Sequence, residues 1–242
     1  MKKYELTSEI IEYKGHTLHR IKALKDFGSV KAGQFGGWIE NEKNLSQDDN
    51  AWIDGEAMVF DNAEVFDNAK VFSYAKVYGN TKIFDNAIIS GYTKVYGKAY
   101  VYNNAKVYDF AEVYDNTEVC DNVLICGYAK VCDYAKVCDN AEVYGNANVS
   151  DYAKVYGNAV IKGDAKVHDA VGYIVFKNFW SSGRYFTWTS SNNKWSVGCF
   201  YGTGEELIKK AYADSEKSGR EYERVVRYVE SILADEKKEK SN

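Results

Sequence analysis

The chain has 242 residues, a formal net charge of −4, no proline and 21 tyrosines. An aromatic fraction of 15% can drive burial, which excludes a mostly disordered chain, and no run approaches the ~18 apolar residues of a membrane span. The first residues lack the apolar stretch of a signal peptide, and the five cysteines include no Cys-x-x-Cys pair, so we expect a cytoplasmic protein. The acidic balance gives no support for nucleic-acid binding.

Residues 1–50 predict a small β cap. Two extended runs, Ser8–Tyr13 and Thr17–Leu24, flank a Lys14-Gly15-His16 turn and indicate a hairpin. Residues 36–46 then lead into the next part of the chain. We assign a capping role to this segment because stacked strands, predicted next, would otherwise leave an unpaired edge.

Residues 51–169 consist of a six-residue repeat. From Ile53 to Val167 every sixth residue is Val or Ile, which gives 20 copies without insertion or deletion. Four residues after each comes a small residue, usually Ala, and between them stand Asp, Gly, Ser or Asn followed usually by Asn. A β-branched residue suits a strand, and the Asp/Gly-Asn pair suits a corner with left-handed backbone. The small residue and the next Val or Ile lie on one side of a strand, so both should face inward.

One hexad makes one short strand and one corner, and three hexads close a triangular coil. Coils stack at the strand spacing of ~4.8 Å, so the repeat predicts six to seven coils. The pattern resembles the hexapeptide-repeat family of left-handed parallel β-helices, and the handedness is implied by that resemblance. The runs Arg20 to Leu24, Gly36 to Glu40 and Asn44 to Ser46 resemble the opening of YdcK-like hexapeptide-repeat proteins, found in bacteria and prophages and described as transferases without an established activity.

A second periodicity supports three hexads per coil. Aromatic residues replace the corner Asn at positions 18 apart, and these are Tyr74, Tyr92, Phe110 and Tyr128, with a second series at Tyr134 and Tyr152. We expect each series to stack along one edge of the prism. Exposed apolar stripes often mark interaction sites, so the four-ring series is our candidate interaction surface. The alternative is that the rings only stabilise neighbouring coils, by about 0.5–1.5 kcal/mol per pair.

Residues 170–234 predict a small α+β module. The expected elements are strands at Tyr173–Lys177, Tyr185–Ser190 and Lys194–Cys199, a turn at Asn192-Asn193, and helices opened by capping boxes at Thr203–Glu206 and Ser218–Glu221, the second burying Tyr222, Val225, Val229 and Ile232. The stretch from Gly198 to Thr203 is similar to a C-terminal module of many phage and prophage proteins. Residues 235–242 form a charged tail that we expect to be disordered.

Residues suited to catalysis are few. The hexapeptide-repeat resemblance implies an acyltransferase with a catalytic His at a subunit interface, a projecting loop and an acyl-coenzyme A groove. No hexad of this chain is interrupted, so no loop is expected to project from the prism. His168, at an outward position of the last hexad, is the candidate base, and the alternative is a solvated side chain.

Four cysteines, Cys120, Cys126, Cys132 and Cys138, occupy successive outward positions. Only Cys120 and Cys138 are one coil apart, and a disulfide between them is geometrically allowed, but a reducing cytosol argues against it. We expect these cysteines to be small outward replacements for Tyr, and we expect no metal site. Cys199 is expected in the core of the C-terminal module.

A ligand site in the C-terminal module would draw on Arg184, Trp188, Arg220 and Arg224. Arg220, Arg224 and Arg227 follow helical spacing and form a basic stripe, and the alternative is a solvated helix face. The repeat region itself carries 11 basic and 17 acidic residues over 51–169, a balance of −6 that opposes phosphate binding.

The sequence therefore predicts a mainly β fold: a solenoid over 51–169 with an N-terminal β cap over 1–50 and an α+β module over 170–234. The function we expect is a non-enzymatic, prophage-associated scaffold or binding protein, forming a homo-dimer or trimer and binding a small anionic ligand or a host protein. Neither nucleic acid nor membrane is an expected partner, and no cofactor is expected. The alternatives are an acyltransferase using acyl-coenzyme A and a phage protein that sequesters a host signalling nucleotide.

Overall fold

The computed structural model describes residues 2–239, apart from the side chains of residues 236 and 237. The chain divides into two compact units, Met1–Gly172 and Tyr173–Asn242, and each is described by itself. The first unit is a parallel β-solenoid that begins with an antiparallel hairpin, and the second combines an antiparallel sheet with two helices. The mainly β architecture predicted from the repeat is confirmed.

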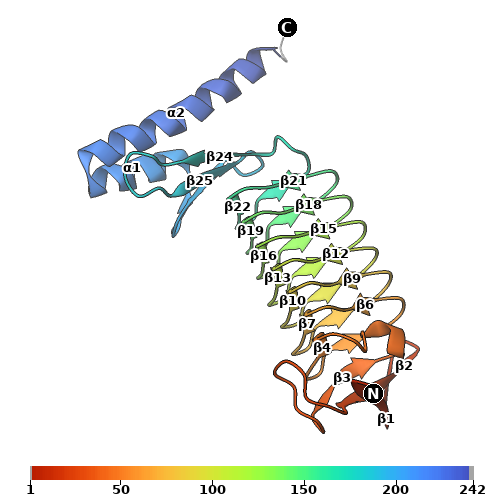
Figure 1. Cartoon of the computed structure of the whole chain (residues 1–242). Coiled ribbons are helices and arrows are strands. Elements are labelled where there is room, and N and C mark those ends of the chain that lie inside the picture. The colour runs from red at the N-terminus through yellow and green to blue at the C-terminus, as the bar shows by residue number, and fades with distance from the viewer. Residues whose placement is uncertain (1, 240–242) are drawn as a thin grey trace. The chain divides into compact units, whose positions relative to one another are not determined.

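Three parallel sheets form the walls of the solenoid, and Figure 1 shows their short strands stacked coil upon coil. The first wall contains β3 (Phe35–Ile39), β5 (Met58–Val59), β8 (Lys76–Val77), β11 (Lys94–Val95), β14 (Glu112–Val113), β17 (Lys130–Val131), β20 (Asn148–Val149) and β23 (Lys166–Val167). The second contains β4 (Trp52–Ile53), β7 (Lys70–Val71), β10 (Ile88–Ile89), β13 (Lys106–Val107), β16 (Leu124–Ile125), β19 (Glu142–Val143) and β22 (Val160–Ile161). The third contains β6 (Glu64–Val65), β9 (Lys82–Ile83), β12 (Tyr100–Val101), β15 (Glu118–Val119), β18 (Lys136–Val137) and β21 (Lys154–Val155).

Strands pair in parallel with a register of 18 residues, as three hexads per coil require. Val95, for example, lies between Val77 and Val113 on the first wall. The Val or Ile of every hexad and the small residue before it are buried, so the core is a column of β-branched side chains and alanines. Because three hexads form one coil, residues 18 apart in the sequence stack directly on one another in the core.

The corners begin with a residue in the left-handed region, such as Asp109 with a φ of 61° or Gly91 with a φ of 73°. Glycine is required at position 91 because a Cβ there would lie 2.6 Å from the carbonyl oxygen of Asp109. The corner aspartates also have a second role that the repeat pattern did not predict. The Asp109 carboxylate accepts a hydrogen bond from the Gly127 amide of the next coil at 3.1 Å, and Asp133 accepts one from Asp151 at 3.1 Å.

The predicted N-terminal hairpin is confirmed as β1 (Tyr4–Tyr13) and β2 (His16–Ala23), which pair antiparallel. After it, β3 pairs in parallel with β5, and a 3-10 turn at Glu42–Asn44 precedes the first coil. Buried Lys3 donates to the carbonyl oxygens of Asp49 and Ala51 at 3.1 and 2.9 Å. The buried Asn44 amide donates to the carbonyl oxygen of Ala63 at 2.8 Å. These two side chains satisfy first-coil carbonyls that have no strand beneath them.

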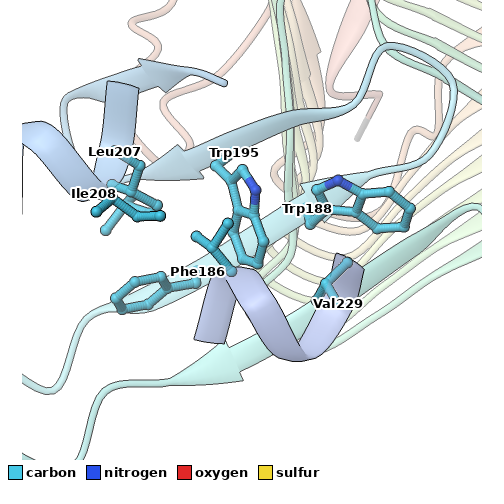
Figure 2. Close-up of a cluster of buried hydrophobic side chains, with 8 residues drawn as sticks. Phe186, Trp188, Trp195, Leu207, Ile208 and Val229 are labelled. Atoms are coloured by element: carbon cyan, nitrogen blue, oxygen red, sulfur yellow. The ribbon is translucent and has the colours of Figure 1, made fainter. Parts of the chain in front are cut away.

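The second unit contains β24 (Tyr173–Lys177), β25 (Tyr185–Thr189), β26 (Lys194–Val197), β27 (Phe200–Gly202), α1 (Gly204–Asp214) and α2 (Glu216–Glu239). Its core joins Phe186, Trp188 and Trp195 of the sheet to Leu207 of α1 and Val229 of α2, as Figure 2 shows. The predicted capping box of α1 is confirmed, because the Thr203 hydroxyl accepts from the Glu206 amide and the Glu206 carboxylate accepts from the Thr203 amide. Strand β27 was not predicted.

Four expectations for this unit are wrong. The third strand ends at Val197 because Gly198 turns the chain with a φ of 53°, and Cys199 is exposed and lies outside the core. Helix α2 begins at Glu216, before the capping box expected at Ser218, whose amide instead donates to the Ser215 hydroxyl. The tail is helical through Glu239, and residues 240–242 lie outside the described part of the chain. Neither described helix carries a stretch long and apolar enough to cross a bilayer.

Candidate interaction surface

The four rings predicted to stack do form a continuous column along one edge of the solenoid. Successive ring centroids of Tyr74, Tyr92, Phe110 and Tyr128 lie 4.9, 5.2 and 5.0 Å apart, with planes within 9° of parallel. Each ring follows a left-handed corner residue, and each corner amide donates to the carbonyl of the next coil, as from Tyr92 to Asp109 at 2.6 Å. The backbone ladder therefore sets the ring spacing.

The column is exposed, although its members are large and apolar. The relative exposures are 51% for Tyr74, 55% for Tyr92, 46% for Phe110 and 61% for Tyr128. Since stacking covers only the ring faces between neighbours, the ring edges remain in contact with water. The second predicted series also stacks, with centroids of Tyr134 and Tyr152 separated by 5.2 Å.

A groove of about 560 Å³ runs beside the four-ring column on the first wall. Besides the rings, its lining residues are Glu56, Met58, Lys76, Lys94 and Glu112. Lys94 Nζ lies 2.7 Å from Glu112 Oε1, and this hydrogen bond raises the pKa of Lys94 and lowers that of Glu112. Lys76 Nζ donates to the Tyr13 hydroxyl at 3.1 Å. Two lysines and two glutamates leave the groove without net charge. We call this surface, with its column, the aromatic groove.

His168, the candidate base, lies beside two polar side chains of the preceding coil. Its Nδ1 lies 2.7 Å from Ser150 Oγ and 3.1 Å from Asp151 Oδ2. A serine nucleophile and an orienting carboxylate must contact opposite nitrogens of the imidazole, so this geometry is not that of a Ser-His-Asp triad. A carboxylate on Nδ1 alone would still orient Nε2 as a base.

The cysteines depart from expectation. Cys120 and Cys138 form a disulfide with their Cα atoms 4.7 Å apart, because neighbouring coils bring residues 18 apart within disulfide range. The expectation that these two are unpaired replacements for Tyr is therefore wrong. Cys126 and Cys132 are free, and burial is the main cause that raises the pKa of both, to about 11 for Cys132. High thiol pKa values disfavour nucleophilic chemistry.

The proposed ligand residues of the second unit show no shared site. Trp188 is 3% exposed and donates its indole N–H to Asn193 Oδ1 at 2.9 Å, so it is a core residue. Arg224 lies 2.7 Å from Glu221, and Arg227 contacts Glu205 and Glu230, which makes the basic stripe largely ion-paired. Arg184 and Arg220 are exposed.

A cluster at the N-terminal hairpin was not predicted. His16 Nδ1 lies 3.1 Å from Glu40 Oε1, and His16 Nε2 lies 3.5 Å from Asp61 Oδ1. The hydrogen bond with Glu40 is the main cause that raises the pKa of His16. Because the carboxylates lie at opposite ring nitrogens, a protonated His16 can form ion pairs with both. No local motif in the sequence connects these three positions.

The comparisons with known proteins give a partial match. No protein-family model matches the chain. A 61-residue stretch is 39% identical to a protein named "Uncharacterized acetyltransferase YdcK" of Escherichia coli (strain K12), and the match covers 22% of this chain. The match covers 19% of that relative, so the chain spans about a fifth of its length. The β-solenoid and this partial match together fit the hexapeptide-repeat family.

Proposed function

We propose that this protein is a non-enzymatic scaffold or binding protein that associates with a second copy of itself through the aromatic groove. The observation that carries the proposal is the four-ring column, in which each residue is about half exposed beside a groove whose lining carries no net charge. Contact between these apolar edges and water is unfavourable, so burying the edges against a partner lowers the free energy.

A second copy suits the dimensions and the charge of the groove. An aromatic side chain buries roughly 150–250 Å², so four half-exposed rings offer about 400 Å² on each copy. Two copies related by a twofold axis would bury about 800 Å² from the rings, and flanking Met58 and lysine stems raise the total toward the ~1,000 Å² of a specific interface. Because the lining carries two positive and two negative side chains, two copies of the groove can face each other without net charge repulsion.

Sedimentation velocity across a concentration series tests this proposal. We expect wild-type protein to dimerise and the double variant Tyr92→Asn, Phe110→Asn to remain monomeric. Asparagine is the natural residue at the same corner position of neighbouring hexads, namely Asn86 and Asn104, so the coil should tolerate the change. The matched control is Tyr134→Asn, Tyr152→Asn, which removes a stacked pair outside the groove.

Two outcomes would overturn the proposal. A wild-type protein that stays monomeric up to about 0.5 mM would show that the groove does not self-associate, since even weak interfaces dimerise near that concentration. A groove variant that dimerises as strongly as the control variant would show that another surface forms the dimer.

An acyltransferase is the second candidate, favoured by the name of the partial relative and by the carboxylate beside His168. In this function His168 Nε2 would remove a proton from the acceptor, Asp151 would hold the ring, and acyl-coenzyme A would supply the acyl group. Calorimetry with acetyl-coenzyme A, followed by release of free coenzyme A in the presence of amine and hydroxyl acceptors, tests it. Binding and turnover that are lost in His168→Ala would support an enzyme, and absence of both would refute it.

A further inference from the structure

A second cavity, of about 390 Å³, lies between the N-terminal cap and the second wall. Its apolar lining comes from Val30, Trp52, Phe72 and Ile88, and its polar lining includes Gln34, Asp54, Lys70 and the corner amides Asn50, Asn68 and Asn86. The volume is at the small end of known ligand sites, which suits a molecule the size of an amino acid. None of these residues belongs to the aromatic groove.

The roof of this cavity is a fixed loop. Phe27 and Val30 exchange two backbone hydrogen bonds of 3.1 and 2.8 Å, which close a tight turn at Gly28. The Phe27 ring packs edge-on against Trp52 with centroids 5.4 Å apart, and Val30 is only 5% exposed. The cavity is therefore preformed, and a ligand need not order the loop that covers it.

The floor of the cavity holds two opposite charges that do not pair with each other. Lys70 lies on β7 between Trp52 of β4 and Ile88 of β10, so an apolar residue flanks it on each side along the wall. Among the described residues Lys70 has no ion-pair partner, and the Asp54 carboxylate accepts a hydrogen bond only from the amide of Gly55, at 2.9 Å. A cation and an anion thus line one small cavity more than 4 Å apart.

The corner amides add a donor and an acceptor at the same place. Along this edge, Asn50 donates to Asn68 at 3.0 Å and Asn86 donates to Asn104 at 3.3 Å. Within the described chain the ladder is interrupted between Asn68 and Asn86, whose facing amide groups both line the cavity. An Asn68 N–H and an Asn86 carbonyl are therefore available to a bound molecule.

We propose that this cavity binds a free α-amino acid with an apolar side chain. The carboxylate of the zwitterion pairs with Lys70, its ammonium pairs with Asp54, and the side chain lies among Trp52, Phe72 and Ile88. A ligand with one charge of each sign matches the two unpaired charges of the lining, whereas a phosphate dianion would meet Asp54 without compensation. The Asn68 amide group donates a further hydrogen bond to the carboxylate.

The test uses L-phenylalanine as the probe in isothermal titration calorimetry, with thermal shift as a second readout. A ligand of about 12 non-hydrogen atoms should bind with a Kd between ~10 µM and ~1 mM. The comparison set is 3-phenylpropanoate, which lacks the ammonium, phenethylamine, which lacks the carboxylate, and glycine, which lacks the apolar side chain. We expect each of the three to bind at least tenfold more weakly than L-phenylalanine.

Two variants test which charged group of the ligand pairs with Lys70 and which pairs with Asp54. Lys70→Met should weaken L-phenylalanine at least tenfold while leaving phenethylamine unchanged, and Asp54→Asn should weaken L-phenylalanine while leaving 3-phenylpropanoate unchanged. Lys106→Met is the matched control, because Lys106 occupies the same outward position on the wall two coils from Lys70 and lies outside the cavity. All three changed side chains lie on the surface of the wall or corner, and far-UV circular dichroism confirms that each variant is folded.

Failure of L-phenylalanine, L-leucine and L-tryptophan to bind at 10 mM would overturn the proposal. A monoanion that binds as tightly as the zwitterion, or a Lys106→Met variant that loses binding as strongly as Lys70→Met, would also overturn it. The dimer proposed for the aromatic groove does not enter this test, because the two sites share no residue.

Discussion

Removing the Cys120–Cys138 disulfide should measurably destabilise the solenoid. The bond joins residues 18 apart, which is one full coil. Closing a loop of this length lowers the entropy of the unfolded chain and stabilises the fold by about 3 kcal/mol. For a chain of 150–250 residues, 1 kcal/mol corresponds to roughly 2–4 °C in melting temperature, so Cys138→Ser should melt about 6–12 °C lower. Serine already occupies the same outward position at Ser90 and Ser150, so the substitution adds no strain.

Thiol counting provides an independent assay of the same bond. In denaturant, Ellman's reagent should detect three thiols before reduction, from Cys126, Cys132 and Cys199, and five after it. In the folded protein only exposed Cys199 should react quickly, since burial raises the thiol pKa of Cys126 and Cys132.

Cys199→Ser is the control, because it removes one thiol and should leave the melting temperature unchanged. Five thiols in protein that has never met a reductant would show that the disulfide does not form. An unchanged melting temperature in Cys138→Ser would show that the loop-closure argument fails.

Further predictions concern the corners, the hairpin histidine and the second unit. Gly91→Ala should destabilise the solenoid by ~2–3 kcal/mol in urea unfolding, against ~1 kcal/mol for Gly157→Ala, because only the first added Cβ meets the next coil's backbone. The pKa of His16 is raised and that of Glu40 lowered, so the histidine's contribution to stability is lost as pH rises through its folded pKa and the glutamate's as pH falls through its own. NMR titration should give His16 a pKa above 6.5, and a Glu40→Gln variant in which it stays elevated would contradict the pairing. Thr203→Ala should cost about 1 kcal/mol in the second unit alone, and a loss spread over both units would disprove a local cap.

The candidate site was partly predictable, and the limit has a physical cause. Aromatic residues 18 apart had to stack once three hexads close a coil, so Tyr92 and Phe110 could be placed beside each other from spacing alone. The groove beside them depends on Met58 and on the Lys94–Glu112 ion pair, whose rotamers follow from packing. The amino-acid cavity lay further beyond reach, because it exists only where the Phe27–Val30 turn covers the second wall.

Wrong expectations arose where local patterns compete with tertiary contacts. The Ser218 capping box is a valid local signal, but the chain starts α2 earlier, at Glu216, after an extended Ser215. Trp188 was a ligand-site candidate on its residue type alone, and the structure places its ring in the core of the second unit. Compartment reasoning disfavoured the disulfide, whereas the coil geometry brings Cys120 to Cys138.

The sequence by itself determined the solenoid and its three walls, and these walls explain why the repeat contains no proline. Each inner strand pairs on both sides, and proline would remove an amide from that ladder. The repeat is local and periodic, so the pattern of one hexad predicts the strand and corner of every other hexad. The 18-residue spacing predicts which side chains stack in columns. Only the tertiary structure decided the second role of the corner aspartates, the capping of first-coil carbonyls by Lys3 and Asn44, and the two cavities. These features join residues from different coils or from cap and wall, and the atoms that meet there are set by packing in three dimensions.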